Sequence, residues 1–333
     1  MTSANRRRTY AWTAAIVLAA GCGALPPRTE SPPPAVVSAD SAVQPLLEPA
    51  ARLVMASPAI SRIWPGFWPP GQPFGIANPH KVVLVVSEVA PESLFTALPP
   101  RVLPRALRGR AYVAYGEVPR LNSARGIGFD LRTRLMGPEM TVLPVRDEVE
   151  STVEVLVHES FHAFQLRAFA RPERQDDAFD RASAARPEFA SLVESERRLL
   201  VAALDAPGRD SLERVVRSYL AVRARRYAST AESVRAEELH LERIEGSAQY
   251  VGSIVAALGD GRRRPEPIAA AVREHLTTEI DASDPGWAIR VRSYGTGAAI
   301  AILLDRLNVS DWKQRLQAGE TFHDLLSRAL AER

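Results

Sequence analysis

The sequence contains a single cysteine, Cys22, and this excludes any disulfide bond within the chain. Lysine is rare beside arginine, and the net charge is only +3. Charges of both signs are interspersed, and no basic block with interleaved aromatic residues is present to bind nucleic acid. Beyond Cys22 there is no apolar run long enough to cross a membrane, and there is no internal repeat. An exported domain of this length can be stable on its hydrophobic core alone.

The N-terminus has the three parts of a secretory signal. Arg6-Arg7-Arg8 is positively charged, Ala11 to Ala20 is a short apolar region, and Gly21-Cys22 follows. This order resembles a bacterial lipoprotein signal, which implies that Cys22 becomes the lipidated first residue. An ordinary cleaved signal that happens to contain a cysteine is the alternative. We expect residues 1–22 to be removed or lipidated, and the Pro- and Ser-rich residues 23–45 to form a disordered tether.

The most informative motif is His158-Glu159-Ser160-Phe161-His162, an H-E-x-x-H pattern. Residues four apart lie on the same face of a helix, so that two imidazoles can bind one tetrahedral zinc. Glu159 then lies beside the zinc-bound water and is suited to act as general base. Asp147-Glu148 favours a helix start, and the pattern from Val149 onward is helical.

The apolar residues of this helix, from Val149 to Phe164, form one broad face, and His158 and His162 fall on the other side. Taken alone, the motif is equally compatible with a surface helix that carries two solvated histidines. A zinc site also needs a third ligand. The metzincin pattern would place Gly at 165 and His at 168, but the chain has Gln165 and Ala168, which excludes that class.

A glutamate from a second helix is the other common third ligand, and Glu245 is the candidate. It lies at the edge of the apolar stripe formed by Leu241, Ile244 and Ala248, where small residues allow another helix to approach. Glu238 and Glu242 lie further toward the polar side and rank behind it. Without the histidine motif, a solvated helix edge would be the simpler interpretation of Glu245.

Together, H-E-S-F-H and the later run Glu245-Gly246-Ser247-Ala248-Gln249-Tyr250 resemble the gluzincin class of zinc metallopeptidases, which includes thermolysin. The resemblance covers these two motifs and their helices. It implies that His158, His162 and Glu245 bind zinc and that Glu159 is the base. The chain departs from thermolysin at Gln249, where an Asp is expected. It also lacks the G-x-M-E-N strand of exopeptidases, of which Gly137–Met140 is only a weak echo.

The expected fold is α+β and zincin-like: a small N-terminal sheet, then the motif helix, then a mainly helical part. Strands are expected at 81–86, 110–115, 127–131 and 141–145, the last at a sheet edge because of its proline, with a short helix near 46–56 and an aromatic loop at 63–70. Further helices are expected at 188–205, 211–227, 230–258, 265–278, 288–307 and 311–331, and an exposed loop at 170–186.

Tyr294 is a candidate hydrogen-bond donor to the oxyanion of a tetrahedral intermediate, with Tyr250 and His240 as rivals. Taken individually, each of the three is better explained by a role in the core. Gly295 and Gly297 beside an apolar helix indicate tight packing.

The sequence therefore predicts one zincin-like domain over residues 46–333, with a sheet and motif helix at 46–169 and a helical part at 187–333. The predicted protein is an exported, membrane-anchored zinc metallopeptidase of the periplasm or cell surface, acting on peptides or proteins. A non-catalytic envelope-anchored scaffold with a zincin fold is the alternative, and a metal-dependent hydrolase of other substrates is a third. The substrate, endo- or exopeptidase preference, membrane and oligomeric state do not follow from the sequence.

Overall fold

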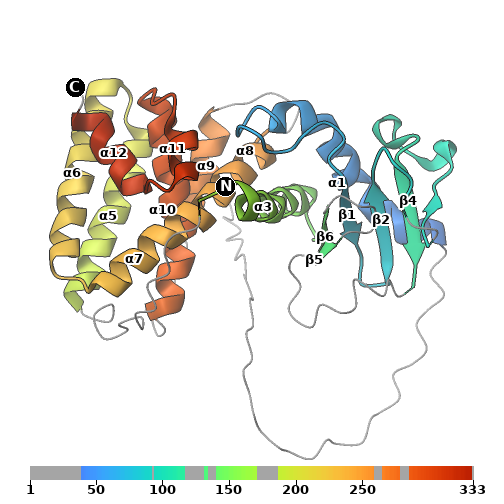
Figure 1. The fold of residues 1–333 in the computed structure, drawn as a ribbon, viewed down its shortest axis with the longest axis horizontal. Coiled ribbons are helices and arrows are strands. Elements are labelled where there is room, and N and C mark those ends of the chain that lie inside the picture. Colours follow the sequence, from blue (N-terminus) through green and yellow to red (C-terminus); the bar gives the residue numbers. More distant parts are fainter. Residues whose placement is uncertain are drawn as a thin grey trace, which may run out of the picture.

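The computed structural model describes residues 39–91, 94–116, 131–133, 140–170, 187–258, 265–277 and 285–331. The chain has an α+β fold, with a mixed sheet at one end and helices at the other (Figure 1). This confirms that the fold class is α+β, as predicted. The predicted signal segment with Cys22, residues 171–186 of the predicted loop and most of the predicted strand at 127–131 lie outside the described residues.

The sheet has the strand order β3-β4-β2-β1-β6-β5. Its strands are β1 (Phe74–Ala77), β2 (Val82–Val86), β3 (Thr96–Ala97), β4 (Ala111–Tyr115), β5 (Leu131–Thr133) and β6 (Met140–Pro144). Only the β1–β6 pair is parallel. The predicted strands at 81–86, 110–115 and 141–145 are confirmed as β2, β4 and β6, whereas β1 and β3 were not expected. Two 3-10 helices, η1 (Pro100–Val102) and η2 (Arg105–Leu107), precede β4.

The prediction that the Pro144 strand lies at the sheet edge is wrong, because β6 is flanked by β1 and β5. Pro144 is tolerated there because it is the last residue of β6, and β5 pairs only with Met140 to Val142. The proline therefore removes no N–H that β5 would need.

Side chains of β2 alternate between the two faces of the sheet. Val82, Leu84 and Val86 join the main core beneath the helices, and Val83 and Val85 join a small cluster on the other face. Both sets are buried, so this strand consists of valine and leucine throughout.

Helix α1 (Ala39–Ile60) packs on the sheet, and Leu46, Leu53 and Ile60 on it are fully buried. It begins earlier than the helix expected near residue 46. Ala42 and Val43 are already buried in its first turns. Residues 39–45, which were expected to be tether, therefore belong to the folded part, and the boundary at residue 46 was placed too late.

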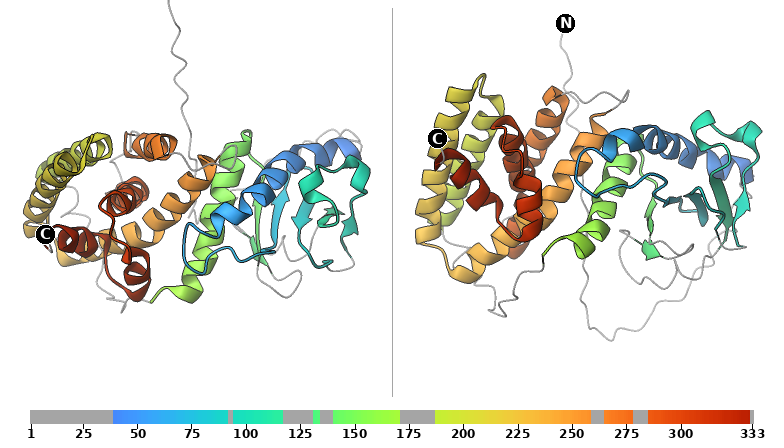
Figure 2. Two further views of the ribbon diagram at one scale, coloured as in Figure 1. Left: turned by 90° about the horizontal axis from the view of Figure 1, so that it is seen from above. Right: turned by 45° about the horizontal axis from the view of Figure 1, so that its top comes forward.

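Helix α3 (Val149–Ala168) lies between the sheet part and the helical part, as the two views of Figure 2 show. The helical part contains α5 (Pro187–Asp205), α6 (Arg209–Ala228), α7 (Glu232–Leu241), the π-helix η3 (Glu242–Gly246), α8 (Ser247–Ala256), α9 (Pro265–Thr277), α10 (Pro285–Arg306), α11 (Trp312–Ala318) and α12 (Phe322–Ala331). The helix expected at 311–331 is split, because Gly319 adopts φ +116° and ends α11.

An aromatic cluster around Trp64 joins the two parts. The Trp64 ring is fully buried, and its centroid lies 4.9 Å from that of Phe161 on α3 and 5.2 Å from that of Trp312 on α11. The aromatic loop thus belongs to the core and packs behind α3, on the side away from its histidines. Among the described helices, none is both long and apolar enough to cross a membrane.

Candidate metal centre

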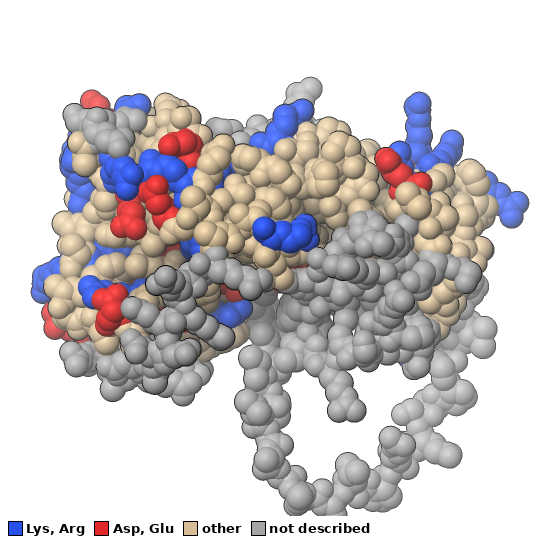
Figure 3. Space-filling model, viewed as in Figure 1, with Lys and Arg blue, Asp and Glu red and all other residues tan. Residues whose placement is uncertain are grey.

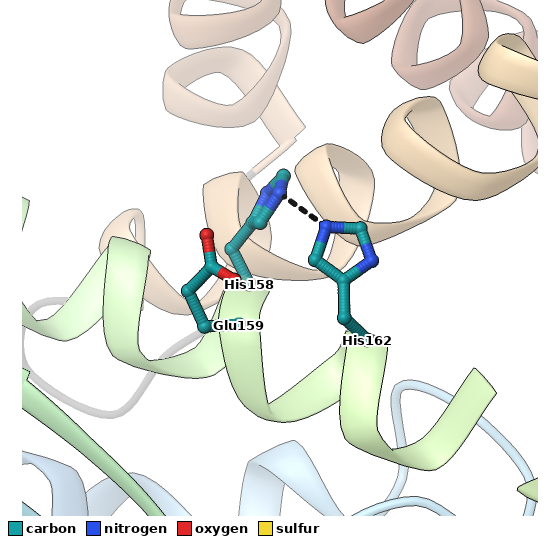
Figure 4. Close-up of side chains that lie close together, drawn as sticks. All are labelled: His158, Glu159 and His162. Atoms are coloured by element: carbon teal, nitrogen blue, oxygen red, sulfur yellow. Dashed lines mark hydrogen bonds between the residues drawn. The ribbon is translucent and has the colours of Figure 1, made fainter. Parts of the chain in front are cut away.

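The two histidines of the motif project from successive turns of α3 toward the helical part (Figure 4). The opposite face of α3 carries Leu156, Val157 and Phe161, which are fully buried. His158 and His162 are not solvated, since their side chains are only 8% and 14% exposed. The interpretation of a surface helix with two solvated histidines is therefore wrong: α3 is covered on both faces.

Three side-chain atoms converge at this place. The Nε2 atoms of His158 and His162 are 3.0 Å apart, and Oε2 of Glu245 lies 3.1 Å from the second and 3.6 Å from the first. Zinc bonds of about 2.0–2.1 Å at tetrahedral angles separate neighbouring ligand atoms by about 3.3–3.4 Å. The three distances bracket this value. His158, His162 and Glu245, which we call the ligand cluster, therefore lie close enough together to hold one divalent metal ion.

The hydrogen bonding of Glu245 also fits a cation. Its side chain is 5% exposed, and its Oε1 accepts from Arg290. Its Oε2, in contrast, is buried without a hydrogen-bond partner, although an imidazole nitrogen lies 3.1 Å away. Buried carboxylate oxygens normally have a partner. Two imidazole nitrogens and an unpartnered carboxylate oxygen, all directed at one point, form a suitable donor set for a divalent transition metal.

The electrostatics of the cluster show how closely its members interact. Burial opposes ionisation of Glu245, but the neighbouring His158 and His162 outweigh it and hold the pKa of Glu245 far below its usual range. Burial disfavours protonation of His162, but the Glu245 carboxylate outweighs this and raises the pKa of His162. In the metal-free protein the carboxylate therefore attracts positive charge to the point that a cation would occupy.

Glu159 lies beside the imidazole pair (Figure 4). Its carboxylate is within 4.8 Å of the ligand nitrogens of both histidines, and its side chain is partly exposed. Its own place on α3 is rotated by about 100° from His158. Glu159 thus flanks the cluster from α3, whereas Glu245 reaches both Nε2 atoms from the helical part. Burial lowers the pKa of Arg146, and the charge of Glu159 opposes that shift, so a cation also lies near Glu159.

Gln165 contacts the ligand cluster. In the sequence it was notable only because it does not match the metzincin pattern. Its Oε1 lies 2.7 Å from Nδ1 of His162. Its Nε2 donates to the carbonyl oxygen of Ile244 at 2.8 Å and to Ser247 Oγ at 2.9 Å. The amide therefore connects α3 to the π-helix η3, which carries Glu245.

Helix α10 contributes Tyr294 and Arg290. The Tyr294 ring stacks on that of His158, with centroids 5.5 Å apart and planes inclined by 8°. Burial, reinforced by the charge of Glu245, raises the pKa of Tyr294 above its ordinary value, so the hydroxyl keeps its proton. Arg290 was not predicted. Its only signal in the sequence is its position one helical turn before Tyr294.

The two rivals of Tyr294 differ in their surroundings. Tyr250 is fully buried in the aromatic cluster and donates its hydroxyl to Asp305 at 2.6 Å, so it belongs to the core. His240 is half-buried, and burial lowers its pKa, with smaller contributions from Glu245 and Arg290. His240 is therefore near the cluster.

The expectation that Glu238 and Glu242 lie toward solvent is wrong, since both side chains are only 1% exposed. They belong to a buried cluster of charges, here called the arginine network, whose members are Glu196, Arg223, Arg226, Glu238, Glu242 and Arg292. In the described part of the chain, none of these residues hydrogen-bonds to His158 or His162, and Glu242 Oε2 accepts from Arg223 at 2.7 Å. Of Glu238, Glu242 and Glu245, only Glu245 faces the imidazoles.

Polar contacts between α3 and the helical part continue beyond the ligand cluster. Glu154, one turn before His158, accepts from Gln249 at 2.7 Å and from Ser253 at 3.2 Å. A Cβ atom added at Gly252 would lie 3.5 Å from the Cβ of His158, so α8 and α3 approach closely here. A shallow pocket lined by Phe67, Ser160 and other residues lies against the aromatic loop instead, and neither histidine lines it.

The chain matches no protein-family model, and no curated protein or solved structure is significantly similar to it. Its function must therefore be inferred from the arrangement of its own residues.

Proposed function

We propose that the protein is a zinc-dependent metallopeptidase of the gluzincin type. One observation carries the proposal: the unpartnered Oε2 of Glu245 lies 3.1 and 3.6 Å from the two Nε2 atoms of the H-E-x-x-H helix. An isolated motif does not bring a third ligand from another helix to the same point. Among the described residues, the group around His158, Glu159 and His162 is the one with metal-binding geometry.

His158, His162 and Glu245 would hold the metal, which leaves one tetrahedral position for water or substrate. A zinc ion there would polarise the scissile carbonyl and lower the pKa of a water molecule to about 7. Glu159 accepts the proton of the attacking water and passes it to the leaving amine. Tyr294, whose raised pKa keeps it protonated, donates a hydrogen bond to the developing oxyanion.

The order of elements supports a zincin-like fold. A sheet precedes α3, α3 carries two ligands and the base, and the third ligand comes from the helical part that follows. This order matches the class that the two motifs resemble, and the resemblance favours peptides as substrates. An intact base argues against the alternative of a non-catalytic scaffold, because loss of that base is what a decayed site would show.

Metal analysis and a peptidase assay of the full-length chain test the proposal. We expect about one zinc per chain and hydrolysis of peptides. Glu159→Gln should retain the zinc and the fold but lose about 10²–10⁴-fold in rate, because the amide cannot accept a proton. His158→Ala and His162→Ala should lose the zinc itself. Stoichiometric zinc in the double histidine variant would refute the site, and bound zinc with no peptidase activity would favour the scaffold.

We also propose that the protein is exported and anchored through a lipid on Cys22. The support is the order of charged, apolar and small residues from Arg6 to Cys22. Cys22→Ser should block processing or move the protein from the membrane to the soluble fraction. A soluble wild-type protein in the exported fraction would leave the secretory signal but exclude the lipid anchor.

A further inference from the structure

Gln165 contacts the ligand cluster without being a ligand, a base or an oxyanion donor. It lies three residues after His162, at the position where the chain departs from the metzincin pattern. Its side chain is buried and its three polar contacts reach two different elements, the imidazole on α3 and the backbone and Ser247 hydroxyl around η3. These contacts determine how its amide is oriented.

The carbonyl oxygen of Ile244 can only accept a hydrogen bond, so the Gln165 atom 2.8 Å from it must be the amide nitrogen. Ser247 supports the same orientation, because its hydroxyl donates to the carbonyl of Arg243 at 2.6 Å and so accepts from Gln165. The other end of the amide, Oε1, then faces His162. This orientation follows from the partners and leaves no freedom to flip.

An amide oxygen has no proton, so the 2.7 Å contact with His162 requires that Nδ1 of the imidazole be the donor. In a neutral imidazole only one nitrogen carries a proton. Nε2 of His162 is therefore left with its lone pair free, and this is the nitrogen that lies 3.1 Å from Glu245 Oε2. Gln165 thus selects the tautomer that binds a metal through Nε2.

The same side chain is bonded to the backbone of η3. The π-helix at Glu242–Gly246 departs from regular α-helical hydrogen bonding immediately around Glu245, and such turns are frequent at functional sites. Ile244, whose carbonyl accepts from Gln165, is adjacent to Glu245. A single amide therefore connects the second histidine ligand to the backbone that carries the third ligand.

We infer that Gln165 is a positioning residue, which fixes the Nδ1–H tautomer of His162 and ties that ligand to the π-turn bearing Glu245. The inference rests on the proposed metal site, which it deepens. Histidine ligands usually donate their second N–H to a carboxylate, a backbone carbonyl or water, and loss of such a partner typically costs about 10–100-fold in metal affinity. Here a neutral amide takes that place, since it must donate to η3 as well as accept from His162.

Gln165→Met tests the inference, because methionine has a similar size but neither an acceptor for His162 nor a donor for Ile244. In the full-length chain we expect its zinc affinity to fall about 10–100-fold, measured by competition with a chromophoric chelator. The tautomer is measured separately by ¹⁵N NMR of the imidazoles in the chelator-treated protein, at a pH where they are neutral. His162 should be Nδ1-protonated in the wild type, and Gln165→Met should lose that preference.

Gln249→Met is the matched control. Gln249 is also a buried glutamine between α3 and the helical part, but its amide contacts Glu154, Ser253 and His275, none of which is a proposed ligand. It should leave the His162 tautomer and the zinc affinity unchanged, whatever it does to stability. Equal losses in the two variants would show that Gln165 acts only through packing, and would overturn the inference.

Gln165→Glu covers the case in which Gln165→Met does not fold. A carboxylate still accepts from His162 Nδ1 but cannot donate to Ile244, so the tautomer should be kept. An Nε2-protonated His162 in the metal-free wild type overturns the inference even if zinc binds. A wild type that binds no zinc but has the Nδ1–H tautomer refutes the proposed function and leaves the tautomer assignment of Gln165 standing. If a folded Gln165→Met binds zinc with unchanged affinity, the proposed metal site stands and the positioning role of Gln165 is refuted.

Discussion

Two groups of buried glutamates lie within eight residues of the same helical run and have opposite surroundings. Glu238 and Glu242 accept hydrogen bonds from guanidinium groups of Arg223, Arg226 and Arg292. Glu245 is buried almost as completely, yet only its Oε1 has an arginine partner, and its Oε2 faces two imidazoles. Basic and acidic side chains are also interspersed over the helical part on the face seen in Figure 3.

The difference separates a structural from a functional use of buried charge. A buried ion network is stable only when each charge is matched, because an unmatched one costs several kcal/mol. In the arginine network the buried carboxylates are matched by guanidinium groups. Arg226 and the other arginines offset the burial of Glu238 and hold its pKa well below the usual range. At Glu245 one carboxylate oxygen faces Arg290 and the other faces the imidazoles of His158 and His162, which is the arrangement that the proposed metal site requires.

The largest effect is expected from Arg226→Met, which breaks the arginine network. Arg226 is the partner of both Glu196 and Glu238, and its removal leaves two buried carboxylates underpaired. The unfolding free energy should fall by about 3–5 kcal/mol, measured by urea denaturation of the metal-free protein. Arg225→Met, at the adjacent and 72% exposed position, is the control and should cost less than about 1 kcal/mol. Equal effects would mean that the network does not stabilise the fold.

A reciprocal pair of variants on the same run should separate the two roles. Glu245→Gln should weaken zinc binding by more than about 100-fold, because it removes a ligand charge rather than an outer partner. Its metal-free stability should change by less than about 1 kcal/mol, since the partner it leaves, Arg290, is 48% exposed and can be solvated.

Glu242→Gln should give the reverse result. Burial raises the pKa of Glu242 to about 7, so the two proteins are compared at about pH 9, where Glu242 is ionised. There the variant weakens charged hydrogen bonds to Arg223 and should cost about 1.5–3 kcal/mol of stability, with zinc affinity unchanged. Zinc affinity is measured by chelator competition and the unfolding free energy by urea denaturation, for both variants. If Glu242→Gln loses zinc and Glu245→Gln does not, the third ligand is wrongly assigned.

The contrast between these glutamates also shows which features could be predicted from the sequence and which could not. The span of α3, the face of its histidines and the position of most helices follow from local periodicity, and these predictions agree with the structure. The burial of Glu238 and Glu242 could not be predicted from local periodicity. A local pattern assigns a charged residue to the surface, and the compensating arginines come from other helices. Gln165 and Arg290 were missed for the same reason: their partners lie 79 and 45 residues away.

Other differences arise from short elements. The strand Phe74–Ala77 was not expected, because it has only four residues and includes Gly75, which has low β-propensity. The π-helix within the predicted helix 230–258 has no distinct periodicity in the sequence. It lies where η3 packs against α10, with the two backbones in contact at Gly246 and Gly297.

The smallest effect is expected from a substitution at this glycine contact. A Cβ atom on Gly246 would lie 2.9 Å from the carbonyl carbon of Gly297 and 3.0 Å from the carbonyl oxygen of Ser293. Both are backbone atoms, so α10 must move away from η3 to make room. Gly246→Ala should therefore cost about 1–3 kcal/mol of stability by overpacking, measured by urea denaturation.

The same displacement would move Tyr294 and Arg290 on α10 away from Glu245, so zinc affinity should fall together with stability. Gly208→Ala is the control, because a Cβ there would meet nothing within 4 Å; as the N-cap of α6 it should cost about 0.5–1 kcal/mol, since alanine caps a helix poorly, and it should leave zinc affinity unchanged. If Gly246→Ala lowers stability and leaves zinc affinity unchanged, the ligand cluster is held by α3 and η3 alone. The close packing of α10 would then serve the fold and not the metal site, and Arg290 would have no part in positioning Glu245.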